Sequence, residues 1–236
     1  NKLFLLIIIM LVLPMISAAD IIYIAKNPSQ VESQYTNAFD EIGFSYDVVY
    51  DSDVSSVDFG DYKLIVVGEG TFTNFRNIPV NSQNSMILNS EHYYQKGSDK
   101  QWGWSSDKSV SSSPSQLKLN TIDSSINDGV NIEFNGYTGS SINSQTILLK
   151  GSKPLGIKII AYKRAGTVGD SAIAYIRPGV LMLNGDVKEG KGLFFGIVDG
   201  DLWTEDSRKL FKNSIEWLIN GEDLDGDGFL DGEDCN

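Results

Sequence analysis

Residues 62–70 read YKLIVVGEG, an uninterrupted apolar run that ends in a pair of glycines. A run without the alternation of a half-exposed strand is typical of a strand that is buried on both faces. The same pattern occurs earlier in residues 21–25 (IIYIA) and later in residues 85–90 (SMILNS). Strands of this kind belong to parallel sheets that helices cover, so the stretch predicts an α/β fold.

A helix is predicted between the first two strands. Asn27 and Pro28 end the strand at 21–25, and Ser29 and Glu32 have the spacing of a capping box. Apolar residues then repeat on one helical face, and Gly43 marks the end of the helix. The next strand is predicted at 44–50. The order strand, helix, strand, strand with short connections indicates a parallel sheet.

The middle of the chain, residues 105–129, is rich in Ser, Asp and Asn and contains only scattered apolar residues. We interpret it as a long surface excursion inserted within one domain, with a weak strand at 117–119. The alternative is a disordered linker between two domains. Neither flank has enough apolar sequence to form a core of its own, which favours the insertion.

The second half of the chain returns to apolar segments. Asn184-Gly185 is a strong hairpin signal, and Thr204 is the predicted cap of a final helix that carries acidic residues in its first turn. A broad apolar stripe continues along this helix to Ile219. Strands are predicted at 146–149, 157–162, 171–176, 180–183 and 193–198.

Composition excludes several classes of function. The 236 residues contain 19 Lys and Arg against 31 Asp and Glu, a net charge of −12, which argues against binding to nucleic acid or to an anionic membrane. The one cysteine, Cys235, rules out an internal disulfide framework and a CxxC site. The one histidine, His92, rules out a histidine-rich metal centre and argues against a Ser-His-Asp triad.

The first nineteen residues have the layout of a secretory signal peptide. Lys2 precedes an apolar run over residues 3–13, and Ser17-Ala18-Ala19 offers small residues before a cut at Asp20. The alternative is a membrane anchor, but the run is short of the roughly 20 residues that a span needs. We therefore expect an exported protein, extracellular or at the cell surface, with no membrane span after cleavage.

Residues 20–220 resemble the class I glutamine-amidotransferase-like superfamily. The resemblance rests on the order of the first elements, on YKLIVVGEG, on a strand leading into Ser90-Glu91-His92 and on the block GKGLFFGIVDGDLWTEDSRKLFKNSIEWL at 190–218. That block is most similar to the secreted, trehalose-utilisation-type branch. The resemblance implies a flavodoxin-like parallel-sheet sandwich of α/β class, to which the sequence adds a short C-terminal calcium-loop segment.

The catalytic residues of that superfamily are missing. Its enzymes place a cysteine after a central strand and serve it with a histidine and a carboxylate, whereas this chain has Glu91 and His92 there and no later histidine. Ser90 is too close to His92 along the chain for the usual geometry of a nucleophile and its base. The remaining candidates for catalysis are Glu69, Glu91 and His92, which would act as an enzyme only if they converge in a cleft.

Other polar and aromatic groups have two interpretations. Tyr93, Tyr94, Trp102 and Trp104 surround His92 and could stack on a small molecule or a glycan, or simply cover the sheet. The Gly68-Glu69-Gly70 turn matches a phosphate-binding loop only weakly. A late acidic group could bind metal but is also what helix capping requires; it consists of Asp199, Asp201, Glu205 and Asp206.

The C-terminal residues 221–236 read GEDLDGDGFLDGEDCN and predict a calcium loop. Oxygen ligands stand at positions 1, 3, 5, 7, 9 and 12 of a twelve-residue loop, with Gly228 at the sharp turn. Aspartate replaces the usual glutamate at position 12. The predicted Ca²⁺ ligands are Asp223, Asp225, Asp227, the Phe229 carbonyl, Asp231 and Asp234.

The same string resembles thrombospondin type 3 repeats, which usually occur in tandem with cysteines that pair between repeats. We therefore expect a longer surface protein, in which Cys235 pairs with a cysteine outside this sequence. The leading interpretation is an exported, non-catalytic binding module whose partners are calcium and a glycan or another cell-surface component. The alternative is a secreted carboxylate-dependent hydrolase or carbohydrate-active enzyme.

Overall fold

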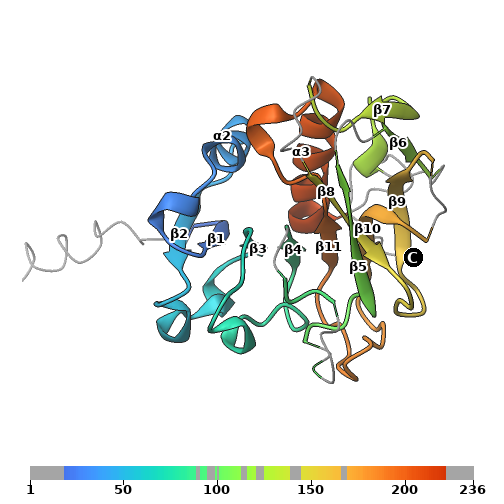
Figure 1. Cartoon of the computed structure of the whole chain (residues 1–236). Coiled ribbons are helices and arrows are strands. Elements are labelled where there is room, and N and C mark those ends of the chain that lie inside the picture. The colour runs from blue at the N-terminus through green and yellow to red at the C-terminus, as the bar shows by residue number, and fades with distance from the viewer. Residues whose placement is uncertain are drawn as a thin grey trace, which may run out of the picture.

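The strands form a single mixed sheet in the order β2-β1-β3-β4-β11-β10-β9-β6-β7, with β8 paired to β10 and β5 paired to β8 (Figure 1). The computed structural model describes residues 19–88, 91–94, 99, 101–112, 116–120, 125–138, 145–165 and 169–221. The strands are β1 Ile21–Ala25, β2 Tyr46–Tyr50, β3 Leu64–Val67, β4 Ser85–Ile87, β5 Asp107–Ser112, β6 Gln116–Leu119, β7 Glu133–Asn135, β8 Gln145–Lys150, β9 Lys158–Lys163, β10 Ser171–Ile176 and β11 Gly192–Phe195. The helices are α2 Ser33–Glu41 and α3 Glu205–Asn220.

The parallel part of the sheet is β2-β1-β3-β4-β11. Every residue of β1, β3, β4 and β11 is buried, as expected for apolar runs that lack alternation. This confirms the predicted α/β fold of flavodoxin-like class and the strands on which the prediction rested. These five neighbouring strands point in the same direction, so their carboxyl ends meet at one edge of the sheet.

The rest of the sheet is antiparallel, and here the interpretation of residues 105–129 as a surface excursion was wrong, although the weak strand predicted at 117–119 is confirmed as β6. They contain β5 and β6, which pair with β8 and β9. Only alternate residues of β6 are buried, so its sequence reads as mostly polar although the strand is part of the sheet. The connection between β9 and β10, residues 164–170, is too short for a crossover helix and requires antiparallel pairing.

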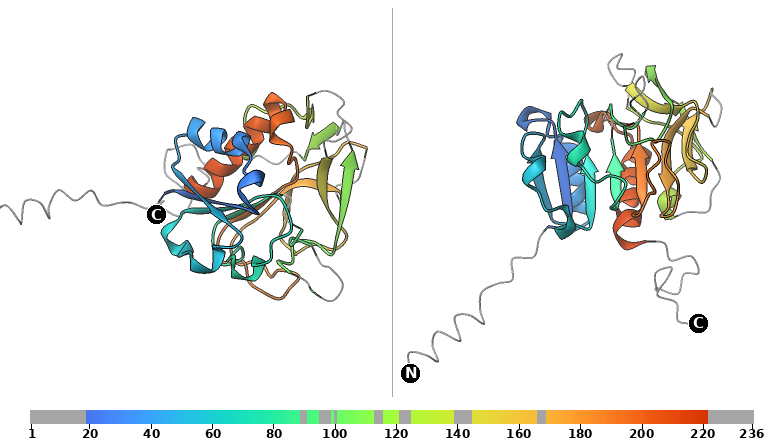
Figure 2. Two further views of the ribbon diagram at one scale, coloured as in Figure 1. Left: turned by 60° about the vertical axis from the view of Figure 1, so that its left-hand side comes forward. Right: turned by 90° about the horizontal axis from the view of Figure 1, so that it is seen from below.

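The order of the strands across the sheet can be followed when the molecule is seen from below. In the right-hand view of Figure 2 the early parallel strands, blue to teal, lie on one side and the later strands, green to yellow, on the other. No helix in the described residues is long and apolar enough to cross a membrane. Burial does not follow this division, because β2 at the edge of the parallel strands is only partly buried whereas every residue of β10 is buried.

Both helices lie on the same side of the parallel strands (Figure 1). They are joined by an aromatic cluster in which the Phe211 ring stacks on Tyr35 at 5.4 Å and on Phe39 at 6.1 Å. Thr204 caps α3 as predicted, because its Oγ1 accepts a hydrogen bond from the Ser207 amide at 3.3 Å. The cluster fixes α3 against the sheet and α2.

Two predicted local features were wrong. The capping box does not form, because the Asn27 side chain accepts from the Ser29 amide and holds 28–30 in a 3-10 turn, so that α2 begins at Ser33 with no side-chain cap. The strand predicted at 180–183 is reduced to one bridge, between Leu181 and Val187. The turn predicted at residues 184–185 between those two bridge residues does form.

Candidate functional site

The candidate site lies where the parallel strands end. Lys26 follows β1, Asp51 follows β2, Glu69 follows β3 and His92 lies after β4. The chain leaves β1 toward β2 on one side and continues from β3 to β4 on the other, so the order of strands reverses between β1 and β3. Open α/β sheets bind their ligands at such a reversal, outside the carboxyl ends of the strands.

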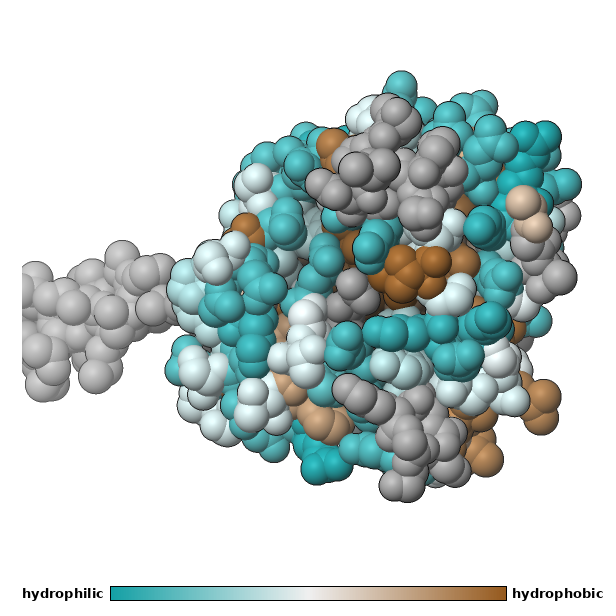
Figure 3. All heavy atoms as spheres, in the orientation of Figure 1, coloured by the Kyte–Doolittle hydropathy of each residue, from teal (hydrophilic) through white to brown (hydrophobic). Residues whose placement is uncertain are grey.

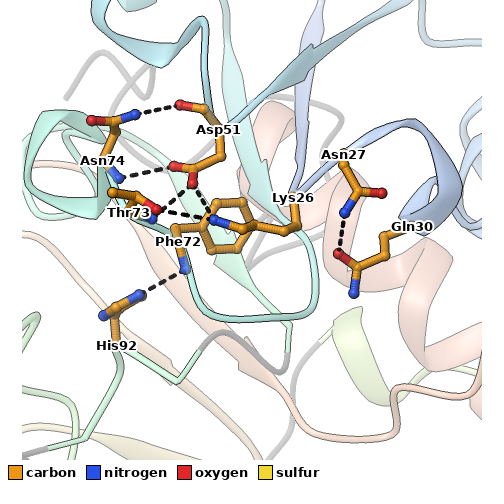
Figure 4. Close-up of polar contacts among 8 residues, drawn as sticks. All are labelled: Lys26, Asn27, Gln30, Asp51, Phe72, Thr73, Asn74 and His92. Carbon is orange, nitrogen blue, oxygen red and sulfur yellow. Dashed lines mark hydrogen bonds and ion pairs between the residues drawn. The ribbon is translucent and has the colours of Figure 1, made fainter.

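Asp51 fastens the loop after β3 to the end of β2 (Figure 4). Its carboxylate accepts hydrogen bonds from the amides of Thr73 at 2.7 Å and Asn74 at 2.9 Å, and pairs with the Lys26 ammonium. Burial by itself raises the pKa of Asp51, but the bonds from Lys26, Thr73 and Asn74 outweigh it and hold the pKa below its usual value. All of these contacts are structural.

His92 is also engaged with this loop. Its Nε2 accepts a hydrogen bond from the backbone N–H of Phe72 at 2.9 Å, so the ring proton of the neutral imidazole lies on Nδ1. The ring stacks on Phe75 with 4.0 Å between centroids, and the side chain is 5% exposed. Burial lowers the pKa of His92. An imidazole whose Nε2 is already an acceptor cannot take a proton there from a nucleophile without losing this bond.

Glu69 and Glu91 lie on neighbouring loops but have different partners. The loops meet where the Glu91 amide donates to the Gly70 carbonyl at 3.2 Å. Glu69 Oε1 accepts from the Tyr35 hydroxyl at 3.0 Å, on the side of α2. Glu91 accepts from the Thr71 hydroxyl at 3.0 Å and pairs with Lys108 at 3.3 Å. The structure thus brings Glu91 and His92 to the same turn, while Glu69 is bonded to another element.

The glycines after β3 serve the backbone. A Cβ on Gly68 would come within 2.9 Å of the Ile24 carbonyl, and Gly70 has φ of 116°, which side chains avoid. The close approach at Gly68 and the positive φ of Gly70 explain why glycine occupies both positions in the turn at the reversal point between β1 and β3.

The acidic residues predicted near the start of α3 have separate partners, which lie in β8 for Asp199 and elsewhere for Asp206 and Glu205. Burial, with repulsion from Asp201, raises the pKa of Asp199, although the Gln145 amide donates to its carboxylate at 2.7 Å. Asp206 accepts from Asn131, and Glu205 pairs with Lys209. In the part of the chain that the structure describes, no group of three or more His, Cys, Asp or Glu side chains is arranged to hold a metal.

The aromatic residues around His92 are mainly core. Tyr93 and Trp104 are fully buried, and Trp102 is 5% exposed. Tyr94 is half-buried beneath the Lys108 ammonium, 5.0 Å from the ring centroid. Trp102 lines a pocket together with residues 75–76, 78–82, 99, 101, 184 and 186. The sequence did not predict this pocket, because its three segments are far apart in the chain, although Trp102 and the Asn184-Gly185 turn were each predicted to have a role.

Solved structures resemble this architecture although their sequences differ. A ThuA-like protein from Bacteroides uniformis superposes with a TM-score of 0.57 at 11% identity, over 86% of this chain and 91% of that one. The fold is similar to that of ThuA-like proteins. A cytoplasmic protein from Salmonella typhimurium gives a TM-score of 0.57 at 9% identity, over 84% of this chain and 99% of that one. Another from the same organism gives 0.54 at 7% identity, over 84% and 98%.

A glutamine amidotransferase from Thermotoga maritima overlaps less well, with a TM-score of 0.48 at 9% identity over 84% of this chain and 97% of that one. No protein-family model and no curated protein sequence matches the chain. The similarity to ThuA-like proteins confirms the expected amidotransferase-like domain at the level of the fold. At these identities it carries no residue roles.

Two predicted segments lie outside the described residues. The signal peptide covers residues 1–19, of which the structure describes only Ala19, and the calcium loop covers 223–234. Their functions remain predictions from the sequence. The described domain begins with β1 directly after Asp20 and ends with α3 at Asn220, so the segments adjoin its first and last elements.

Proposed function

We propose that this chain is an exported, non-catalytic binding module: an α/β domain of ThuA-like fold that recognises a ligand, joined to a calcium-binding loop. The observation that carries the non-catalytic part is the hydrogen bond from the Phe72 amide to His92 Nε2. This is the only histidine of the chain. Because Nε2 of His92 accepts this backbone hydrogen bond, the imidazole is not free to act there as a general base.

The carboxylates near His92 support the same proposal. Glu91 is shared between the Thr71 hydroxyl and the Lys108 ammonium, and Glu69 faces the Tyr35 hydroxyl. In an enzyme, a catalytic acid and its partner base face the same cleft, and their different surroundings shift their pKa values in opposite directions. Here the two carboxylates are held by separate elements, α2 and β5, through those partners.

The second candidate is a carboxylate-dependent hydrolase at the same edge. It is favoured by Glu91, whose backbone amide meets Gly70 and whose position after β4 is where the sheet presents reactive groups in open α/β folds. Its catalysis would pass through Glu91 with Glu69 as the second carboxylate. This candidate predicts turnover that the binding module lacks.

Turnover assays separate the two candidates. Purified chain is incubated with chromogenic esters, amides and glycosides, beside the Glu91→Gln and Glu69→Gln variants. The binding module predicts no turnover above that of the variants. Turnover that both substitutions abolish, with melting temperatures unchanged, would replace the proposal with the hydrolase.

A further inference from the structure

The end of α3 lies at the amino edge of the sheet, opposite the carboxyl edge. Lys191, directly before β11, donates from its ammonium to the Trp217 carbonyl at 2.9 Å, and the ammonium lies 5.3 Å from the centroid of the Trp217 ring. The same ring packs on Tyr175 in β10, with 4.9 Å between the centroids. Helix α3 ends at Asn220, within one turn of Trp217. The chain therefore leaves the described domain at Gly221 beside the end of β10 and the start of β11.

Three basic residues gather at this edge, and we call them the basic edge: Lys158, Arg177 and Lys191. Strand β10 is antiparallel to β9 and to β11, so the start of β9, the end of β10 and the start of β11 meet there. Lys158 is the first residue of β9 and stands opposite Tyr175, and Arg177 directly follows β10. Lys158 and Arg177 are exposed, whereas Lys191 is half-buried. The edge thus places three cations next to the end of α3.

Charge is distributed unevenly along this chain. Residues 150–191 contain eight Lys and Arg against three Asp and Glu, although the net charge of the whole chain is −12. Residues 221–236, which follow α3, contain seven Asp and Glu and no Lys or Arg. Two exposed carboxylates, those of Glu189 and Glu216, stand near the basic edge in the sequence and offset only part of its charge. The positive edge and the acidic segment that begins next to it therefore attract each other.

The acidic segment begins close enough to reach all three cations. Lys191 binds the carbonyl of the residue four positions before Gly221. Arg177 lies two positions beyond Tyr175, whose ring contacts Trp217 in the last turn of α3. An extended chain covers about 3.5 Å per residue, so residue 227 can lie up to about 20 Å from the end of α3. Carboxylates of the segment can therefore meet the basic edge without any change in the described domain.

Charge, rather than apolar contact, distinguishes the two partners. The face of the molecule in Figure 3 is mainly hydrophilic, and its apolar patches are small and separate. The acidic segment has three large apolar side chains, which are those of Leu224, Phe229 and Leu230. Ion pairs between exposed groups are weak and sensitive to salt. A contact of this kind is readily reversed by a competitor for the carboxylates.

We propose that residues 222–236, which lie outside the described residues, dock on the basic edge when calcium is absent, and that calcium releases them by binding the same carboxylates. The inference rests on the calcium loop of the proposed function. Asp223, Asp225 and Asp227 cannot pair with Lys and Arg while they serve as calcium ligands, so the docked state and the calcium-bound state exclude each other. Calcium shifts the population toward the released state, and docking in turn weakens the apparent affinity for calcium.

The test of docking uses Cys235, which is the one cysteine of the chain and takes a spin label without any substitution. In calcium-free buffer of low ionic strength, we expect the label to broaden the amide NMR signals of residues 158, 177 and 191. The double variant Lys158→Gln with Arg177→Gln should reduce this broadening. Millimolar calcium, or 0.5 M salt at about half the Debye length of physiological buffer, should reduce it in the unmodified chain as well.

A matched control removes the same kinds of charge from the opposite edge. Lys150 is exposed and ends β8 next to Leu149, which pairs with the first residue of β10 at the carboxyl edge. Arg164 directly follows β9 at the same edge, where its side chain is 49% exposed. The double variant Lys150→Gln with Arg164→Gln should leave the broadening at residues 158, 177 and 191 unchanged. Both double variants are checked for an unchanged melting temperature.

Titration calorimetry with calcium tests the competition. Each exposed ion pair changes an equilibrium constant by about 1.4- to 5-fold, so the variant that lacks Lys158 and Arg177 should bind calcium about fivefold more tightly than the unmodified chain. The control variant that lacks Lys150 and Arg164 should change the affinity by less than about twofold, because salt screens charges at the far edge.

The possible failures are distinguishable. Broadening that both double variants change equally, or that is absent in calcium-free buffer, overturns the docking. Broadening that persists at saturating calcium, or equal calcium affinities in the two double variants, overturns the competition. No calcium heat from the intact chain overturns the calcium-binding part of the proposed function and the release with it, whereas the spectra in calcium-free buffer still decide whether the segment docks.

Discussion

The Nε2 atom of His92 accepts a hydrogen bond from the backbone N–H of Phe72 at 2.9 Å, and this contact joins the loop after β3 to the turn after β4. The imidazole ring stacks on Phe75, and its centroid lies 5.6 Å from that of the Trp102 ring. The residue with the most obvious catalytic potential in the sequence is therefore part of the framework. The loops that it joins form one wall of the pocket and one side of the carboxyl edge.

The first prediction concerns His92 and pH. Burial lowers its pKa in the folded protein below the ordinary value of 6.5, so the unfolded chain binds more protons between the two values. The stabilisation is fully present above about pH 6.5 and is lost as pH falls through the folded pKa. Urea unfolding of the chain and of His92→Gln from pH 7.5 to pH 5 should show a steeper loss for the unmodified chain. Nitrogen NMR should find the proton on Nδ1; a proton on Nε2 would contradict the contact.

Lys188 provides a second pH prediction. Its side chain is fully buried, its ammonium donates to the Val80 carbonyl at 2.7 Å and to that of Gln83, and burial lowers its pKa to about 7. Between about pH 7 and the ordinary value of 10.5 the unfolded chain binds the additional proton, so stability gains from this group as pH rises. Unfolding at pH 6, 8 and 10 should show this gain, and Lys188→Met should remove it. The control is Lys63→Met, whose side chain is 63% exposed and which should keep the gain.

A third prediction concerns the clamp at Asp51. Asp51→Ala removes the partner of the Lys26 ammonium and leaves the amides of Thr73 and Asn74 without their acceptor. We expect the free energy of unfolding to fall by about 3 kcal/mol, measured by urea denaturation. Asp47→Ala, which removes an exposed carboxylate bonded to a tyrosine, should cost no more than about 0.5 kcal/mol. Equal losses in the two variants would show that the clamp has no special role.

Asp51 also has a pH dependence of its own. Hydrogen bonds hold its folded pKa below 3.8 despite the opposing effect of burial, so its stabilisation is present above about pH 3.8 and is lost as pH falls through the folded pKa. The difference in stability between the unmodified chain and Asp51→Asn should shrink through that acidic range. A constant difference would contradict the lowered pKa.

The fourth prediction concerns calcium. Asp223 and Asp227 occupy positions 1 and 5 of the predicted loop, whereas Glu222 lies just outside it. Titration calorimetry in millimolar calcium should give a weak site, of order 10⁻⁴–10⁻³ M as in extracellular modules. Asp223→Ala or Asp227→Ala should abolish the heat, and Glu222→Ala should leave it. No heat from the intact chain, or equal heat from Asp223→Ala, would rule out the loop.

The fifth prediction concerns export. Lys2, the apolar run at 3–13 and Ser17-Ala18-Ala19 predict removal of residues 1–19. Mass spectrometry of protein recovered from a secreting host should find Asp20 at the N-terminus. In the folded domain Asp20 pairs with Lys63 at 2.8 Å and accepts from the Ser45 hydroxyl, so the new terminus would lie on an ordered part of the molecule. A mature chain that retains residues 1–19 would indicate a membrane anchor instead.

The sequence by itself determined the parallel half of the fold and the last helix. Strands buried on both faces are apolar at nearly every position, so β1, β3 and β11 can be recognised in the sequence as continuous apolar runs. Thr204 and the apolar stripe after it define α3 because capping and helical periodicity are local properties. The strands β3 and β4, both predicted from the sequence, also placed Glu69, Glu91 and His92 near one edge of the sheet.

Only the tertiary structure decided what those residues do. The antiparallel strand β6 buries alternate residues, and β5 has a sequence as polar as a loop, so their places in the sheet depend on pairing with distant partners. That His92 accepts from Phe72 depends on how two loops meet, and the pocket depends on Asp186 holding Asn81 and Asn184 together. Hydrogen bonds between residues as far apart as 81 and 186 leave no periodic pattern in the sequence, because nothing local requires them.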